Sequence, residues 1–426
     1  MVVQIVFFLL LVVAIGLLYR TSLEMQKCFR ITKPVSFDGL WQKRLQLTLK
    51  VVLGQSKIMR KPFVGMIHAL VFWGFLVITI GTLELVVDGL SGQYRSFSGL
   101  ERIYEIITAS GDIFAVIVLL GAAFFLVRRM GFHIKRFYGI ELTRMNKQDA
   151  NIALLFILFL MVSLLGLNTY DLLWHETQTE GWYPVSNILA SWINGNGLMA
   201  REGFHFFWWG HILLIFIFAN YLPYSKHFHV FMSLPNVFLS SMKPLAFLPA
   251  MPDVTKEVKL MLTGDAFQVE ETNEPGRFGV KDVEDVTSLN YLNALTCTQC
   301  GRCTEVCPAN ITGKELSPRK IFVDLRNRMM EKGPFLSEAP KYHDDLSLVS
   351  DYITNEELWA CTTCNACAQE CPLNISHPNL IMDMRRYLVL EEGKVPEGLN
   401  AMFANIENNG APWKFSPQDR LNWTQQ

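Results

Sequence analysis

The sequence predicts a mainly α-helical chain, in which a five-helix transmembrane bundle comes first and a smaller helical domain follows. Two observations lead to this fold class. Half of the 426 residues are hydrophobic, and most of these lie before residue 225 in runs long enough to cross a bilayer. Eight of the nine cysteines lie after that point, in two short clusters. The net charge of -1, without any arginine-rich run, argues against nucleic-acid binding.

Five apolar stretches are long enough to span a membrane. The first has no basic residue before it and no small-residue cleavage site after it, so we expect a retained helix rather than a signal peptide. The expected spans are 2–19, 64–87, 107–127, 152–172 and 204–224.

The loops between these stretches predict the orientation of the chain. Segments 20–61 and 128–150 carry sixteen Lys and Arg residues, and the alternate loops carry three. Basic loops remain in the cytoplasm. We therefore expect a multi-pass protein of a bacterial or archaeal cytoplasmic membrane, with the N-terminus outside and everything after residue 225 in the cytoplasm.

Histidines in the apolar helices need a partner, because an unpaired imidazole is costly in hydrocarbon. His68 lies near the cytoplasmic end of the second stretch, and His229 near the cytoplasmic end of the fifth. His211 is eighteen residues before His229, about 27 Å away along a continuous helix. His68 and His229 therefore share a depth and could ligate one haem iron from both sides. Hydrogen bonds to neighbouring helices are the alternative.

After the membrane domain, taken as 1–230, the sequence changes character. Segment 231–290 is rich in proline near its start and is predicted to be a linker along the membrane surface. The rest, 291–426, is predicted to be a cytoplasmic domain.

The cytoplasmic domain carries the motif C-x2-C-x2-C-x3-C-P twice, and this spacing is typical of 4Fe-4S clusters. The fourth cysteine of each motif is expected to ligate the other cluster. Structural zinc is the alternative, but zinc sites usually use two separated pairs of ligands. The first predicted ligand set is Cys297, Cys300, Cys303 and Cys371, and the second is Cys361, Cys364, Cys367 and Cys307.

A proline-opened helix is expected after each motif, with Ser317 and Pro318 at the start of one and Pro378 at the start of the other. The domain is thus an internal duplication in which helices carry the clusters. We expect an α-helical, ferredoxin-like domain with two clusters.

The second to fifth stretches resemble the cytochrome b subunit of respiratory nitrate reductase. The resemblance rests on "IHALVFWGF" and on the spacing of His211, Pro223 and His229 in "H-x11-PYSKHFH". It implies a haem b held by His68 and His229. It also gives His211 as a ligand of a second haem, although Ile78 stands where that family has the partner histidine.

Residues 290–426 resemble the small iron–sulfur subunit of heterodisulfide reductase. The cysteine motifs, the helices after them and "NNGAPWKFSPQDRLNW" carry this resemblance. It implies a partner domain with Cys-Cys-Gly motifs, and this sequence contains no Cys-Cys pair. Any substrate-converting domain is therefore expected on another chain.

Together these features predict a subunit of a quinone-linked oxidoreductase. It would relay electrons between a soluble partner and membrane quinone through two 4Fe-4S clusters and haem b. The partner would be a Cys-Cys-Gly subunit or an electron-transferring flavoprotein. A component of a redox-driven ion pump and a non-catalytic membrane sensor or anchor are the alternatives. The direction of electron flow is not encoded in the spacing.

Overall fold

The computed structural model is mainly helical in the part of the chain that it describes, and no strand occurs there. Segment 264–276, within the predicted linker, lies outside that part. The described residues are 2–37, 39–139, 141–175, 180–193, 197–263, 277–340 and 342–425.

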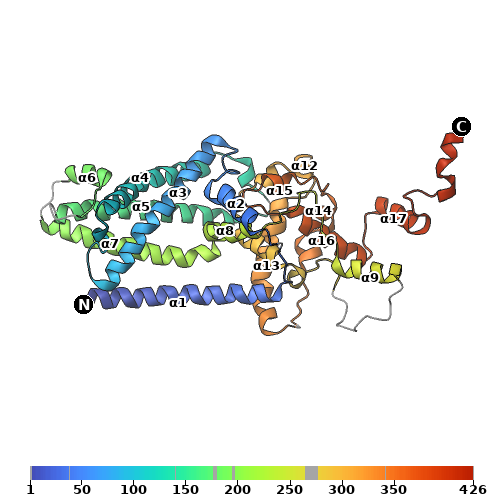
Figure 1. The fold of residues 1–426 in the computed structure, drawn as a ribbon, viewed down its shortest axis with the longest axis horizontal. Helices are drawn as coiled ribbons and strands as arrows, with labels where there is room; N and C mark the ends of the chain where they lie inside the picture. Colours follow the sequence, from blue (N-terminus) through green and yellow to red (C-terminus); the bar gives the residue numbers. More distant parts are fainter. Residues whose placement is uncertain are drawn as a thin grey trace.

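Five helices are long and apolar enough to cross a membrane, as the sequence predicts. Each is longer than the apolar stretch from which it was expected. They form a bundle at one end of the molecule, and the cysteine-containing domain lies at the other end (Figure 1). Their bounds are α1 Val2–Ile31, α3 Pro62–Ser91, α4 Arg102–Gly131, α5 Arg144–His175 and α7 Gly197–Tyr221.

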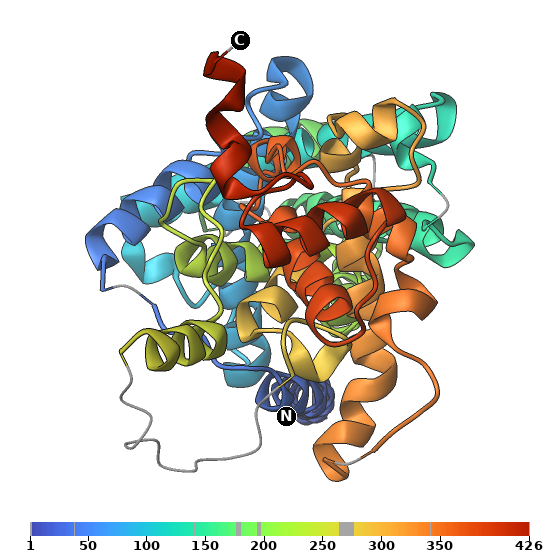
Figure 2. The same cartoon turned by 90° about the vertical axis from the view of Figure 1, so that its right-hand side faces the viewer.

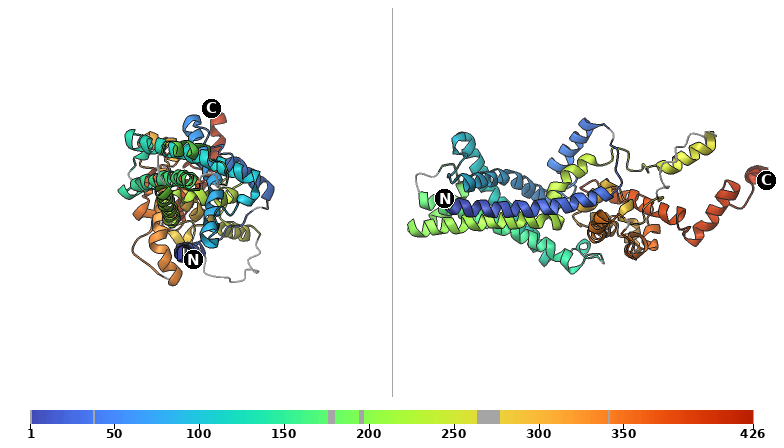
Figure 3. Two further views of the ribbon diagram at one scale, coloured as in Figure 1. Left: turned by 90° about the vertical axis from the view of Figure 1, so that its left-hand side faces the viewer. Right: turned by 90° about the horizontal axis from the view of Figure 1, so that it is seen from below.

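Helices that follow one another in the bundle pack side by side. Helix α4 packs between α3 and α5, and α5 packs against α7. Helix α1 lies beside α7, as the right-hand view of Figure 3 shows, and it also contacts α3. Glycines let α3 and α4 approach closely: an added methyl would come within 2.5 Å of Val118 at Gly74, and within 2.5 Å of Val71 at Gly121.

Shorter helices connect the bundle and build the second domain. In the membrane domain and at its junction with the second domain these are α2 Trp41–Thr48, α6 Pro184–Ser191 and α8 His229–Leu239. Helix α9 Pro252–Thr263 belongs to the predicted linker and lies at the end of the molecule that carries the second domain (Figure 1). The second domain contains α10 Ser288–Thr296, α11 Arg302–Glu305, α12 Pro308–Ile311, α13 Pro318–Glu338, α14 Asn355–Trp359, α15 Ala366–Glu370, α16 His377–Leu390 and α17 Glu397–Asn409.

Helices α13 and α16 form the centre of the second domain, which faces the viewer in Figure 2. Phe322 and Leu325 of α13 and Leu380 and Met384 of α16 are fully buried in one apolar core. As expected, proline stands in the first turn of both helices. The two clusters of cysteines are thus carried by loops that these helices anchor.

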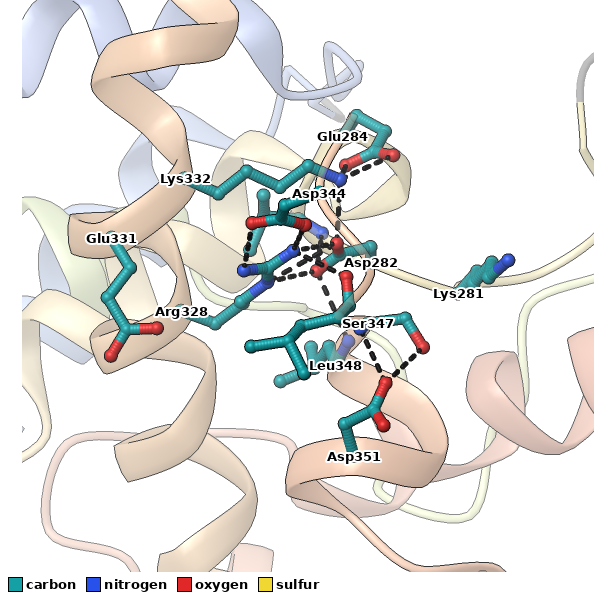
Figure 4. Close-up of polar contacts among 12 residues, drawn as sticks. Lys281, Asp282, Glu284, Arg328, Glu331, Lys332, Asp344, Ser347, Leu348 and Asp351 are labelled. Carbon is teal, nitrogen blue, oxygen red and sulfur yellow. Dashed lines mark hydrogen bonds and ion pairs between the residues drawn. The ribbon is translucent and has the colours of Figure 1, made fainter. Parts of the chain in front are cut away.

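A buried charged network fastens α13 to the segment that leads into the domain (Figure 4). The carboxylate of Asp282 accepts hydrogen bonds from Arg328 Nε at 3.0 Å and from Lys332 Nζ at 2.7 Å. Arg328 also pairs with Asp344. Burial alone would raise the pKa of Asp282, but these hydrogen bonds outweigh it and hold that pKa below its ordinary value. The three buried charged side chains of this network, Asp282, Arg328 and Lys332, are therefore paired.

Helix α1 reaches out of the bundle and packs on α13. Near its end, Phe29 meets the ring of Tyr291 edge-on, with centroids 4.6 Å apart. Cys28 is buried in the core of the second domain. The first and second domains therefore share a packed interface from the first helix of the chain onward.

Candidate functional site

Four cysteines from both motifs line one cavity of the second domain. Cys361, Cys364 and Cys367 belong to the second motif, and Cys307 is the last cysteine of the first. Pro318 and Pro378, which open α13 and α16, also line this cavity. The structure therefore brings together the residues of the second predicted ligand set.

The first predicted set also comes together. Cys303 and Cys371 each lie within electrostatic reach of Cys297 and Cys300. Burial raises the pKa of Cys297 to about 11 and that of Cys371 to about 12. Buried thiols of this kind remain neutral unless a cation stabilises the thiolate. Iron binding would therefore displace protons from these sulfurs.

The two motif loops have the same backbone shape. Gln299 and Gly301 have positive φ values of 55° and 73°, and the equivalent Thr363 and Asn365 have 54° and 61°. In the second loop, the Thr363 amide donates a hydrogen bond to Cys361 Sγ at 3.4 Å. Amide donors to sulfur help to set the potential of an iron–sulfur cluster. The internal duplication thus extends from the sequence to the backbone conformation.

The donor sets suit clusters better than single metal ions. Among the residues that the structure describes, no three His, Cys, Asp or Glu side chains converge on a position for one ion. Four cysteines surround a cavity instead, and a four-iron cluster takes one thiolate at each of four corners. Zinc would need its four ligands close to a single point.

The two histidines predicted to share a depth lie near each other in the structure. His68 is in the first turns of α3, and His229 opens α8, close enough for the charges of the two rings to interact. Helix α7 ends at Tyr221 and two 3-10 turns follow, so His229 does not continue the fifth membrane helix. The pairing therefore involves a break in the helix after Tyr221 rather than one long helix.

Each histidine of this pair has a ring nitrogen that could coordinate a metal. Lys226 O lies 3.1 Å from His229 Nδ1, which leaves the other ring nitrogen of His229 available. His68 Nδ1 is buried and has no hydrogen-bond partner. A buried polar atom without a partner costs about 1–3 kcal/mol, and a metal bound at this ring would remove that cost.

His211 has different surroundings. It is buried in α7, and its Nδ1 lies 2.8 Å from Ser163 Oγ of α5. Ile78 packs in an apolar cluster with Val118 and Met161. In the structure His211 is therefore hydrogen-bonded to Ser163, and apolar side chains surround Ile78.

Several residues that join the two domains were not predicted from the sequence. Lys57 Nζ donates to Cys371 O at 3.0 Å, and Lys226 Nζ lies 3.3 Å from Gln299 Oε1. Arg319 and Glu141 form a buried ion pair at 2.7 Å. Lys226 lies inside the quoted "PYSKHFH" motif, so the sequence did point to this segment as part of a site. Lys57 and Arg319 contact partners too distant in sequence for any local pattern to indicate them.

Comparison with known proteins agrees with this arrangement. A 4Fe-4S dicluster domain matches residues 296–375. The probable iron-sulfur-binding oxidoreductase FadF of Bacillus subtilis is 29% identical over 419 residues, which cover 91% of this chain and 56% of FadF. The EtfAB:quinone oxidoreductase of Syntrophomonas wolfei is 27% identical over 405 residues, which cover 87% of this chain and 52% of that protein.

A shorter match involves a probable membrane-anchored ferredoxin of Chromohalobacter salexigens. It is 35% identical over 132 residues, which cover 28% of this chain and 20% of the ferredoxin. No solved structure is significantly similar. The chain spans about half the length of FadF and of the EtfAB:quinone oxidoreductase. It thus carries a 4Fe-4S dicluster domain after five membrane-length helices and is similar, over most of its length, to these two oxidoreductases.

Proposed function

We propose that this chain is an electron-transfer subunit that connects a soluble redox partner with membrane quinone through two 4Fe-4S clusters and a haem b. The observation that supports this most is the order of the candidate sites along the molecule. The second cysteine set lies within the second domain. The first set lies against the membrane domain, and the His68–His229 pair lies on the membrane side of the first set.

One residue contacts both the first cysteine loop and the histidine pair. The Lys226 side chain reaches Gln299, which stands between Cys297 and Cys300, and its carbonyl oxygen lies next to His229 Nδ1. Such short connections hold neighbouring sites at a fixed separation. When bound, the clusters and the haem would supply one-electron chemistry, and the chain would supply their positions and surroundings.

The names of the similar proteins indicate the kind of partner. One is described as an EtfAB:quinone oxidoreductase, so an electron-transferring flavoprotein and quinone are the partners we propose. A Cys-Cys-Gly iron–sulfur protein is the second candidate for the soluble side. We place the second domain in the cytoplasm, because the most basic loops of the bundle lie on its side.

Metal analysis and quinone assays test this proposal. We expect about eight irons and about eight acid-labile sulfides per chain from two clusters, and one more iron for the haem. Zinc without labile sulfide would contradict the cluster assignment. Quinone reduction in vesicles with a membrane-potential dye tests the remaining alternatives. A potential that rises with turnover indicates an ion pump, and the absence of any quinone turnover indicates a sensor or anchor.

A further inference from the structure

The two cysteine sets have different surroundings. The membrane domain covers the first set from several sides. Lys57 donates to Cys371 O, and Arg302, which stands between Cys300 and Cys303, donates to Lys57 O at 3.1 Å. An added methyl at Gly301 would lie 2.6 Å from Arg136 O. The loops before α3 and after α4 therefore lie directly on the first cysteine loop.

The second set faces away from the membrane domain. All residues that line its cavity lie between Cys307 and Ile381, so none of them comes from the bundle. Cys364 is exposed, whereas the cysteines of the first set are buried or half-buried. Among the residues that the structure describes, the second set is therefore the more open of the two to a macromolecule in solution.

A large groove of about 1110 Å³ adjoins the second set. Pro308, Ala309 and Thr362 line both the cavity and the groove. Trp359 forms part of the groove wall and is held by Arg385, whose guanidinium lies 4.8 Å from the indole ring. Arg385 in turn donates to Cys361 O at 2.5 Å. A rigid, partly exposed aromatic side chain thus stands beside a predicted cluster ligand.

Helix α17 begins at the far rim of this groove, where Pro396 and Asn400 line it. No residue of α17 is buried, and the helix projects away from the body of the molecule (Figure 1). The groove and the helix form one continuous surface that the described part of the chain leaves uncovered. A protein that occupied the groove would also cover α17.

We propose that the groove beside Trp359 is the docking site of an electron-transferring flavoprotein, and that the second cysteine set is the port through which electrons pass between that protein and the chain. This rests on the proposed electron-transfer function. When the partner is the donor, it is oxidised by one electron and the cluster of the second set is reduced by one. The roles are reversed when it is the acceptor. No bond is formed or broken in either direction.

The exposure of the two sets can be tested without any partner. The probe is a soluble dysprosium chelate, which speeds the magnetic relaxation of nearby cluster signals in electron paramagnetic resonance. The signals are assigned with Cys364→Ser for the second set and Cys300→Ser for the first. We expect the microwave power for half-saturation to rise several-fold for the second cluster and to change little for the first. An equal or larger effect on the first cluster would overturn the proposal.

Docking is tested with reduced electron-transferring flavoprotein as the donor. We expect Trp359→Ala to lower the second-order rate of reduction about tenfold relative to the rate with dithionite, as for loss of an aromatic anchor at an interface. The matched control is Trp192→Ala, because Trp192 is 75% exposed at the opposite end of the molecule. Equal rates in the two variants would overturn the docking site. If the flavoprotein reduces no variant, the proposed partner fails, and the dysprosium measurement still decides the port.

Discussion

Cys307 ends the first cysteine motif but lies with the cysteines of the second. We predict that Cys307→Ser disturbs the cluster held by Cys361, Cys364 and Cys367, because this residue would supply its fourth thiolate. Paramagnetic resonance of the reduced protein measures which cluster signal changes. Cys371→Ser is the matched variant and should change the other signal. Loss of only the first cluster in Cys307→Ser would contradict the crossed arrangement.

The histidines provide the second prediction at the scale of single residues. We expect His68→Ala to abolish the spectrum of a low-spin haem b, because His68 lies near His229 and its buried Nδ1 has no protein partner. His211→Ala should leave that spectrum largely intact, because His211 is engaged by Ser163. Reduced-minus-oxidised absorbance spectra of the purified variants provide the measurement. Equal loss of one haem signal in both variants would refute the pairing.

At the scale of elements, the loop between α4 and α5 is clamped to the start of α13. Glu141 accepts hydrogen bonds from Arg319 Nε and from Ser317 Oγ, both at 2.7 Å. We predict that Glu141→Gln lowers the free energy of unfolding by about 3 kcal/mol, because it leaves a buried guanidinium without its counter-charge. The thermal midpoint for loss of cluster absorbance measures the effect.

The control for this clamp is another ion pair at the same junction. Glu305 pairs with Lys61 at 2.7 Å, but its side chain is 44% exposed. Glu305→Gln should cost less than about 1 kcal/mol, because water screens the pair. Equal losses of stability in the two variants would show that burial does not strengthen the Arg319–Glu141 ion pair.

At the scale of the whole molecule, the candidate cofactor sites form a path with an open soluble end. We predict that the purified chain exchanges electrons with quinone only when an artificial dye replaces the soluble partner. Addition of the partner protein should restore turnover with the physiological donor. The measurement compares the chain alone with the complex purified in mild detergent. Physiological turnover by the chain alone would defeat the proposed relay.

The sequence predicted the fold well where the signal was local. Long apolar runs predicted the five membrane helices, and Pro318 and Pro378 marked the helices after each motif. The residues that join the domains were harder to predict. Arg326 of α13, for example, is buried and donates to Pro223 O at 3.1 Å. Partners separated by a hundred residues leave no periodic pattern in the sequence.

Side-chain roles at element ends were also only partly predictable. Ser317 precedes α13 as expected of an N-cap, but its hydroxyl makes no capping bond. It bonds to Glu141 and Thr304 instead. Local propensity thus placed the helix start, and the contact with the membrane domain decided what the side chain does there.

One of the differences between the duplicated loops, Gly301 against Asn365, reflects the contact of the first loop with the membrane domain. Gly301 and Asn365 have the same left-handed backbone, which asparagine tolerates almost as well as glycine. At Gly301, however, a side chain would collide with the backbone of Arg136. A side chain is therefore excluded at this position of the first loop, whereas the matching position of the second loop carries one. An asparagine at position 301 would push the first cysteine loop away from the backbone of Arg136 in the membrane domain. A glycine at position 365 would only remove a side chain and would create no such collision.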